Sequence, residues 1–262
     1  MNYAVYALLG LYKLVVKTGL MQTRFGQALF TQSYMLYKRL IEARDAKALL
    51  KYVPAGSCVI DVGANIGFFT LQFAQQVGNN GHVIALEPEA HNFRQLEQQV
   101  RGAGLSGRVT LLEAVAAAQA GELHLQLDPY HPANHKISDQ GVAVRAVTLD
   151  ALALMQSLPV ALVKIDVQGA EMQVLDGAMD LLNRHHPALF VEVDDQALQG
   201  FGTSATALLQ RLLELGYRIY QLNHQGSGAP LTLAQALAVQ AAAGYTDFLF
   251  VHARQKSDPE IR

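Results

Sequence analysis

The feature that most limits the fold of this chain is an alternation of strand-like and helix-like segments that begins near residue 58. Short runs rich in Val, Ile, Leu and Phe alternate with longer helical stretches, which is the pattern of a parallel sheet covered by helices. The expected strands are 58–63, 82–88, 109–116, 162–166, 188–194, 217–222 and 248–252, and the expected helices lie near 67–77, 89–103, 169–183 and 203–215. No clear crossover joins the last two strands, although 234–243 is an alanine-rich helical stretch, so a closing antiparallel pair is expected. The sequence predicts an α/β fold.

Residues 121–150 break this alternation. The runs LHLQL and VAVRAVTL alternate in polarity with a period of two, which predicts a β-hairpin inserted into the main domain. The main domain is expected to span 51–253, followed by a polar tail at 254–262.

The N-terminal segment, 1–50, is expected to be helical. Its apolar run is interrupted by Lys13 and Lys17 before it reaches the length of a membrane span. Packing of these helices on the domain or on a second copy, as a homodimer, is the favoured interpretation. Contact of residues 1–20 with a membrane surface is the alternative.

The charge balance and the cysteine content exclude two classes of protein. Twenty basic residues against 22 acidic ones give a net charge of −2, so a nucleic-acid partner lacks its usual basic footprint. The single cysteine, Cys58, excludes an intrachain disulfide framework and is expected to be a small buried side chain. We therefore expect a cytoplasmic protein.

The segment DVGANIG, 61–67, follows the first strand and opens the first helix. Glycines in this position allow a tight turn and a close approach to a ligand at the helix N-terminus. Glu87 ends the second strand 20 residues after Gly67, where a carboxylate can bind ribose hydroxyls. Together these features predict a nucleoside-containing ligand.

Two such ligands must be distinguished, a nicotinamide dinucleotide and S-adenosylmethionine. Dinucleotide loops read G-x-G-x-x-G, whereas Asp61 and Asn65 occupy positions of this loop. A carboxylate repels a pyrophosphate but attracts the methionine ammonium. The loop therefore favours S-adenosylmethionine.

At this point the sequence resembles the FkbM-like family of S-adenosylmethionine-dependent methyltransferases. The resemblance lies in DVGANIGFFT, VIALEP with Phe93 after it, VTLLEAVA, VTLD, KIDVQGAE with VLDGA, and FVEVD, in the expected order over about 55–250. It implies a class I methyltransferase fold, Rossmann-like, with seven strands of which the last is antiparallel and with helices on both faces. It also implies transfer of a methyl group to oxygen, often on a sugar or a polyketide.

The resemblance also assigns site residues. It implies a cofactor site that surrounds the methionine, the ribose and the adenine in turn, with one acidic residue beside the reactive methyl group. The implied residues are Asp61, Gly63, Ala64, Asn65 and Gly67 for the methionine, Glu87, Pro88 and Phe93 for the ribose pocket, Glu113, Ala114 and Val115 for the adenine, and Asp166 beside the methyl group.

Asp166 is the leading candidate to orient or deprotonate an acceptor hydroxyl. It ends the fourth strand, and the carboxyl ends of parallel strands line the ligand sites of such sheets. Its alternative role is that of a helix N-cap. Glu171, in the first turn of the next helix, is expected to be structural because a carboxylate suits the helix dipole there.

Other polar residues have weaker assignments. His131 and His135 lie in the insertion, and either is a candidate base, a candidate lid residue or a solvated loop residue. Pro132 argues against a helix that would present both rings to a metal, so no metal site is expected. Glu192 and Asp194 either bind a polyol acceptor or are solvated turn residues.

Two functions of different classes remain. The first is methyl transfer from S-adenosylmethionine to a hydroxyl of a small molecule. The second is a non-catalytic binding or scaffold protein on the same fold, and a nicotinamide-dependent oxidoreductase is a weaker third.

Overall fold

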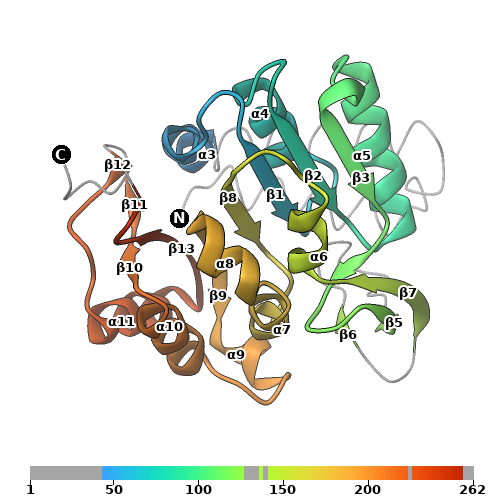
Figure 1. Cartoon of the computed structure of the whole chain (residues 1–262). Coiled ribbons are helices and arrows are strands. Elements are labelled where there is room, and N and C mark those ends of the chain that lie inside the picture. Colours follow the sequence, from blue (N-terminus) through green and yellow to red (C-terminus); the bar gives the residue numbers. More distant parts are fainter. Residues whose placement is uncertain (1–42, 127–135, 138–140, 224–225, 256–262) are drawn as a thin grey trace, which may run out of the picture. The chain divides into compact units, whose positions relative to one another are not determined.

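A seven-stranded sheet forms the centre of the molecule, with the strand order β10-β13-β9-β8-β1-β2-β3 (Figure 1). β13 is antiparallel to both of its neighbours, and the other strand pairs are parallel. The strands are β1 (Cys58–Val62), β2 (His82–Leu86), β3 (Val109–Leu112), β8 (Val160–Ile165), β9 (Ala188–Asp194), β10 (Tyr217–Tyr220) and β13 (Tyr245–His252). The predicted mostly parallel sheet with an antiparallel last strand is confirmed.

This computed structural model describes residues 43–126, 136–137, 141–223 and 226–255. The chain divides into two compact units, Met1–Ala43 and Arg44–Arg262. The expected helical segment 1–50 therefore lies mostly outside the described residues, and so do His131 and His135. Of that segment, the structure describes α3 (Ala43–Leu49) and the start of a 3-10 helix (Leu50–Tyr52).

The strands are apolar because both faces of the sheet are covered. All five residues of β1 are buried, and Cys58 is one of them, as predicted. Burial on both faces removes the polar–apolar alternation of half-exposed strands and leaves continuous apolar runs. A charged residue within such a strand therefore needs an oppositely charged or hydrogen-bonding partner.

Helices pack on both faces of the sheet. On one face, the side chains of β1, β2, β8 and β9 form a large apolar core with helices from the second half of the chain. On the other face, Phe69 contacts Phe190 of β9, with ring centroids 6.0 Å apart. The helices are α4 (Phe68–Gln76), α5 (Ala90–Gly102), a 3-10 turn (Ser106–Arg108), α6 (Leu149–Leu154), α7 (Glu171–Asp176), α8 (Met179–His185), α9 (Asp195–Gln199), α10 (Ala205–Glu214) and α11 (Leu233–Ala243).

The helix expected at 169–183 is two helices, α7 and α8. The break falls at Gly177, where a Cβ atom would lie 2.1 Å from the carbonyl oxygen of Ala117. The carboxylate of Asp150 then accepts hydrogen bonds from the N–H groups of Asp180 and Leu181 and so caps the start of α8. The close approach at Gly177 and the cap from Asp150 are both contacts with segments that are distant in the sequence.

The inserted hairpin is confirmed, and it belongs to a second sheet with the order β4-β7-β5-β6. Its strands are β4 (Val115–Ala116), β5 (Gly121–Gln126), β6 (Lys136–Ile137) and β7 (Val142–Val147), and β5 and β7 are antiparallel. The expected single strand 109–116 is therefore split, because the chain leaves the main sheet after β3 and enters the second sheet at β4. A short hairpin of β11 (Leu222–Asn223) and β12 (Gly226–Ser227) precedes α11.

Among the residues that the structure describes, no helix is long and apolar enough to cross a membrane.

Candidate active site

The glycine loop after β1 turns through left-handed backbone at three positions. The φ angles are 76° at Gly63, 51° at Asn65 and 96° at Gly67, which is the N-cap of α4. A Cβ atom on Gly63 would lie 1.9 Å from the carbonyl oxygen of Asp166, so only glycine fits there. The loop and the segment after β8 are therefore in direct backbone contact.

Asp61 lies beneath this loop and is fully buried. Its Oδ2 accepts a hydrogen bond from the Thr70 hydroxyl at 2.6 Å, and its Oδ1 lies 3.6 Å from Nζ of Lys164. Oδ1 has no hydrogen-bond partner among the described residues, so the ion pair is its main compensation. Asp61 was expected to attract the ligand's ammonium group, but its charge is already paired inside the protein.

Lys164 connects the two sides of the site. Its ammonium group donates to the Gly63 carbonyl at 3.2 Å and to Oδ2 of Asp166 at 3.3 Å, and it lies 5.3 Å from the centre of the Phe69 ring. Only 4% of its side chain is exposed. One buried cation thus holds the glycine loop, Asp61 and Asp166 together.

Glu87 follows β2, as predicted, and 5% of it is exposed. Its carboxylate accepts hydrogen bonds from the N–H groups of Asn65 at 2.8 Å and Glu89 at 3.1 Å. Burial raises the pKa of this carboxyl to about 7, although those backbone hydrogen bonds oppose the rise. Glu87 therefore fixes the left-handed Asn65 and joins the ends of β1 and β2.

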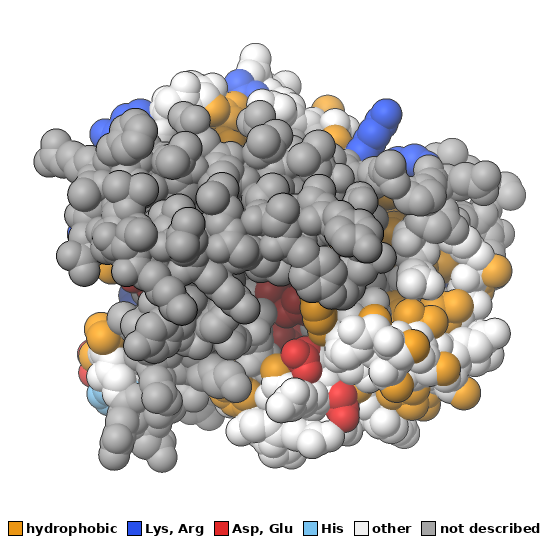
Figure 2. Space-filling model, turned by 180° about the vertical axis from the view of Figure 1, so that it is seen from behind, with side chains coloured by type: hydrophobic (Ala, Val, Ile, Leu, Met, Phe, Trp, Pro, Cys, Tyr) orange, Lys and Arg blue, Asp and Glu red, His pale blue; other side chains and the backbone are white. Residues whose placement is uncertain are grey.

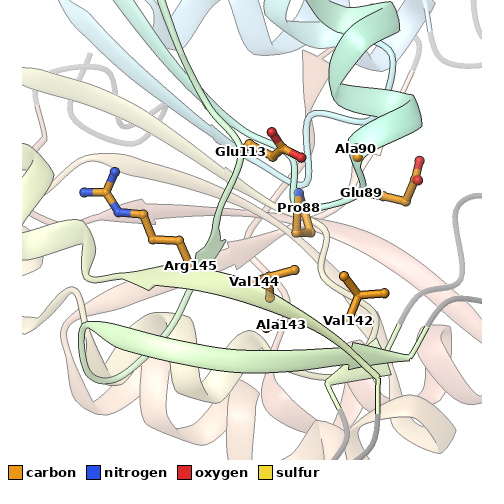
Figure 3. A pocket seen from close by; sticks show the side chains of 8 residues that line it. All are labelled: Pro88, Glu89, Ala90, Glu113, Val142, Ala143, Val144 and Arg145. Atoms are coloured by element: carbon orange, nitrogen blue, oxygen red, sulfur yellow. The ribbon is translucent and has the colours of Figure 1, made fainter.

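A cavity of about 160 Å³ opens beside Pro88 and Glu89, the residues that follow Glu87 (Figure 3). One wall comes from the segment after β2 and from Glu113 at the end of β3, and the other wall comes from β7 of the second sheet. The lining residues are Pro88, Glu89, Ala90, Glu113, Val142, Ala143, Val144 and Arg145. The structure thus brings Pro88 and Glu113 together in one pocket.

Three other residues assigned by resemblance, Phe93, Ala114 and Val115, do not line this pocket. Ala114 is buried in the main core, and Val115 is buried in a small cluster with Ala117 and Ala146 of the second sheet. Phe93 is partly exposed on the first turn of α5. The side chains of Ala114 and Val115 are therefore covered by other apolar groups of the protein.

Asp166 lies at the carboxyl end of β8, with 32% of its side chain exposed. Its N–H donates to the carbonyl of Val62 at 3.2 Å, which places it level with the start of the glycine loop. Glu192 of β9 is within hydrogen-bonding reach of it. The Asp166 side chain is therefore partly exposed, while its backbone is held against β1.

Two further acidic residues, Asp194 and Glu171, have structural roles. The carboxylate of Asp194 caps α9 by accepting from the Ala197 N–H at 3.1 Å. Glu171 is 1% exposed and accepts from the Gly169 N–H at 3.0 Å, as expected of a structural residue. Burial raises the pKa of Glu171 to about 7.

Sequence reasoning missed Lys164 and Gln168. Lys164 carried a usable signal, since a lysine within a fully buried parallel strand requires an acidic partner. Gln168 has a φ of 56°, and its side-chain amide donates to Oε2 of Glu192 at 3.0 Å. A left-handed glutamine next to a glycine has no comparable signal in the sequence.

The electrostatics of the site fit a positively charged ligand. Asp61 and Asp166 lie on either side of the single ammonium group of Lys164, and Glu192 lies beside Asp166. Figure 2 shows that Asp and Glu side chains gather near the middle of this face of the molecule. S-Adenosylmethionine carries a sulfonium and an ammonium group against one carboxylate, so the residues present fit it.

A seven-stranded sheet with one antiparallel strand, a glycine loop after β1, and carboxylates after β2 and β8 define the class I methyltransferase fold. Residues 61–219 match the family model described as the methyltransferase FkbM domain. That match covers more than half of the chain, and the chain belongs to this family. No curated protein matches the sequence.

Three solved structures with similar folds are distant in sequence from this chain. A methyltransferase FkbM from Methylobacillus flagellatus is 16% identical, with a TM-score of 0.48 over 76% of this chain and 44% of that one. A putative rRNA methylase from Clostridium thermocellum is 14% identical, with a TM-score of 0.48 over 80% and 95%. An S-adenosylmethionine-dependent O-methyltransferase from Thermotoga maritima is 17% identical, with a TM-score of 0.46 over 82% and 67%. This chain thus spans less than half of the length of the FkbM structure.

Proposed function

We propose that the protein transfers the methyl group of S-adenosylmethionine to a hydroxyl oxygen of a small molecule. The observation that carries this proposal is the position of Asp166. This partly exposed carboxylate is joined to the glycine loop by Lys164, by the bare Cα of Gly63 and by the carbonyl of Val62. An acceptor held by Asp166 would therefore keep a fixed position relative to a ligand held by that loop.

We propose that Glu87, Pro88 and Glu113 hold the cofactor. Glu87 accepts one backbone hydrogen bond on each carboxylate oxygen and another from the Asn92 side chain, and each oxygen has two acceptor positions, so one position is left for a ribose hydroxyl. Pro88 and Glu113 would enclose the adenine in the cavity that they line. Asp61 would act through Lys164, and the cofactor, when bound, supplies a methyl group activated by its positive sulfur.

The protein's own contribution is alignment of the two reactants and acceptance of a proton. Asp166 would accept the proton that the acceptor hydroxyl loses as its oxygen takes up the methyl group that the cofactor supplies. Base assistance of this kind typically contributes about 10²–10⁴-fold, and orientation supplies about 7–11 kcal/mol of the barrier. No metal is required for these steps.

The nature of the acceptor rests on the family. The resemblance to FkbM-like proteins implies that the acceptor is a hydroxyl of a sugar or a polyketide. The carboxylate of Asp166 also suits a polyol, because carboxylates accept hydrogen bonds from hydroxyls. His131 and His135 remain proposed alternatives for the base, and they lie outside the described residues. A homodimer through the N-terminal segment, and contact of residues 1–20 with a membrane surface, also remain proposals.

Calorimetric titration of the wild-type protein with S-adenosylmethionine tests the function. We expect one site per chain, and we expect Glu87→Ala to weaken binding at least tenfold, because a hydrogen bond to a charged group contributes roughly 1.5–3 kcal/mol. Glu122→Gln, at an exposed position on β5, is the matched control and should bind like the wild type. The absence of binding by the wild type would exclude the proposal, and preferential binding of a nicotinamide dinucleotide would replace it.

The acceptor is sought with S-adenosylmethionine that carries a deuterated methyl group. Transfer to a sugar or polyketide in a panel of hydroxylated compounds gives a mass increase of one labelled methyl group. Asp166→Asn should abolish that transfer while it leaves binding of the cofactor measurable.

A further inference from the structure

A second carboxyl group, that of Glu192, lies beside Asp166 at the end of the sheet. β8 and β9 are parallel neighbours with Ile165 opposite Val191, so the next residues of the two strands, Asp166 and Glu192, are adjacent. The two side chains are within hydrogen-bonding reach of each other. Two ionised carboxylates have no hydrogen to donate, so a hydrogen bond between them requires one proton.

The surroundings of the two carboxyl groups differ. Asp247 of β13 is the cross-strand neighbour of Glu192, and Glu171 is a further acidic residue nearby. The side-chain amide of Gln168 donates to one oxygen of Glu192. Burial raises the pKa of Glu192 far above its ordinary value, and the negative charges of Asp166 and Asp247 act in the same direction.

Asp166, by contrast, has a cation beside it. The ammonium group of Lys164 lies 3.3 Å from its Oδ2, and a positive charge at that distance favours the ionised form of a carboxyl group. Of the two groups, Glu192 is therefore the one that holds the shared proton, and Asp166 is the one that holds the negative charge.

We propose that Glu192 is a positioning residue for methyl transfer, which carries a proton and donates it in a hydrogen bond to Asp166, so that Asp166 stays ionised and faces the acceptor hydroxyl in one orientation. This inference rests on the function proposed above. During transfer the acceptor O–H bond breaks and its proton passes to Asp166, while Glu192 keeps its own proton. Loss of the Glu192 proton at alkaline pH would place two negative charges side by side and would remove the orienting hydrogen bond.

The protonation of Glu192 is tested without any substrate, by infrared spectroscopy of the whole chain. At about pH 9 we expect a C=O stretch of a protonated carboxyl group that is present in the wild type and absent in Glu192→Gln. Glu171→Gln is the matched control and should retain this band, because the pKa of Glu171 is about 7. Absence of the band from the wild type, or its persistence in Glu192→Gln, would overturn the inference.

Asp166→Asn provides a second, independent variant. It removes the negative charge that holds the proton on Glu192, so the band should disappear at a lower pH than in the wild type. An unchanged titration would show that the two carboxyl groups are not coupled, and the inference would be wrong.

The role in transfer is tested by the pH profile of kcat with the compound that accepts the labelled methyl group. Glu192→Gln keeps a hydrogen-bond donor but cannot ionise, so it should retain the neutral-pH kcat and lose the alkaline decline. Glu192→Ala should lower kcat about 10- to 100-fold with little change in KM, because a hydrogen bond to a charged group is lost. Equal losses in both variants, or an alkaline decline that survives in Glu192→Gln, would contradict a positioning role.

Failure of the two proposals gives different results. A wild type that does not bind S-adenosylmethionine excludes the methyl-transfer function, whatever the infrared spectra show. A wild type that binds and transfers, but whose infrared spectrum lacks the Glu192 band, excludes only the inference about Glu192.

Discussion

Individual residues in this site are constrained by contacts between loops that are far apart in the sequence. Gly63 and Asp166 touch through their backbones although about a hundred residues separate them. The sequence identified both residues as site positions, because each follows a strand of a parallel sheet. It could not identify the contact, which depends on the lateral order of β1 and β8 in the sheet.

Gly63→Ala tests this contact. The new Cβ atom would lie 1.9 Å from the Asp166 carbonyl oxygen, so the loop must move, and we expect a lower free energy of unfolding together with weaker binding of S-adenosylmethionine. Gly56→Ala is a matched control, because Gly56 is also left-handed (φ 77°) but has no atom within 4 Å of the added Cβ. The control should cost only about 1–2 kcal/mol of backbone strain and leave binding unchanged. Equal effects of the two variants in denaturant unfolding and calorimetry would contradict the argument.

The ion pair of Asp61 and Lys164 is a contact that the sequence alone does not predict. The sequence assigns Asp61 to the ligand's ammonium group, because it gives the position of Asp61 in the loop but does not reveal its partner. The partner comes from β8, the adjacent strand, and leaves Asp61 fully buried. The sequence therefore predicts that a carboxylate lies near the end of a strand. It does not predict which group that carboxylate pairs with, because the partner comes from the neighbouring strand.

The helices and strands were predictable to the extent that their apolar pattern is local. Each expected strand of the main sheet was found, because burial on both faces produces continuous apolar runs. The split between α7 and α8 was not predictable from the same pattern. Val174, Ala178 and Leu181 continue one apolar face through the break, so the periodicity is that of a single helix.

Asp150→Ala tests the start of α8. Asp150 accepts from the N–H groups of Asp180 and Leu181, at 3.2 and 2.8 Å, and loss of these helix-capping bonds should lower the free energy of unfolding by about 1 kcal/mol. Asp176→Ala, at the exposed end of α7, is the control and should change stability by less than about 0.5 kcal/mol. If denaturant unfolding shows equal losses for both, Asp150 does not cap this helix.

At the scale of the whole molecule, buried ionisable groups link stability to pH in two opposite directions. Burial lowers the pKa of His252, whose ring stacks on His186 with centroids 4.0 Å apart, so protonation in acid destabilises the folded state. Burial raises the pKa of Glu87 and Glu171 to about 7, so the folded state holds protons that the unfolded state releases. The contribution of these carboxyl groups is fully present below the unfolded pKa of 4.5 and is lost as the pH rises through about 7.

Glu171→Gln isolates one of these groups. The glutamine is neutral at every pH and can still accept from the Gly169 N–H, so the histidines contribute equally in the two proteins. We expect the wild type to lose up to about 3 kcal/mol of stability relative to the variant between about pH 5 and pH 8. Glu122→Gln serves as the exposed control and should show no such difference. Denaturant unfolding at both pH values decides this, and parallel profiles of wild type and Glu171→Gln would refute it.

The second sheet has a consequence for how such a protein can diverge. Four of the eight residues that line the cavity, Val142 to Arg145, belong to β7 and contribute no strand to the main sheet. Substitutions there can change the shape and charge of the cavity while the seven-stranded sheet and the Lys164 ion pairs keep their packing. Evolution can therefore vary this wall of the cavity independently of the fold, while the opposite wall, formed by Pro88, Glu89, Ala90 and Glu113, stays unchanged.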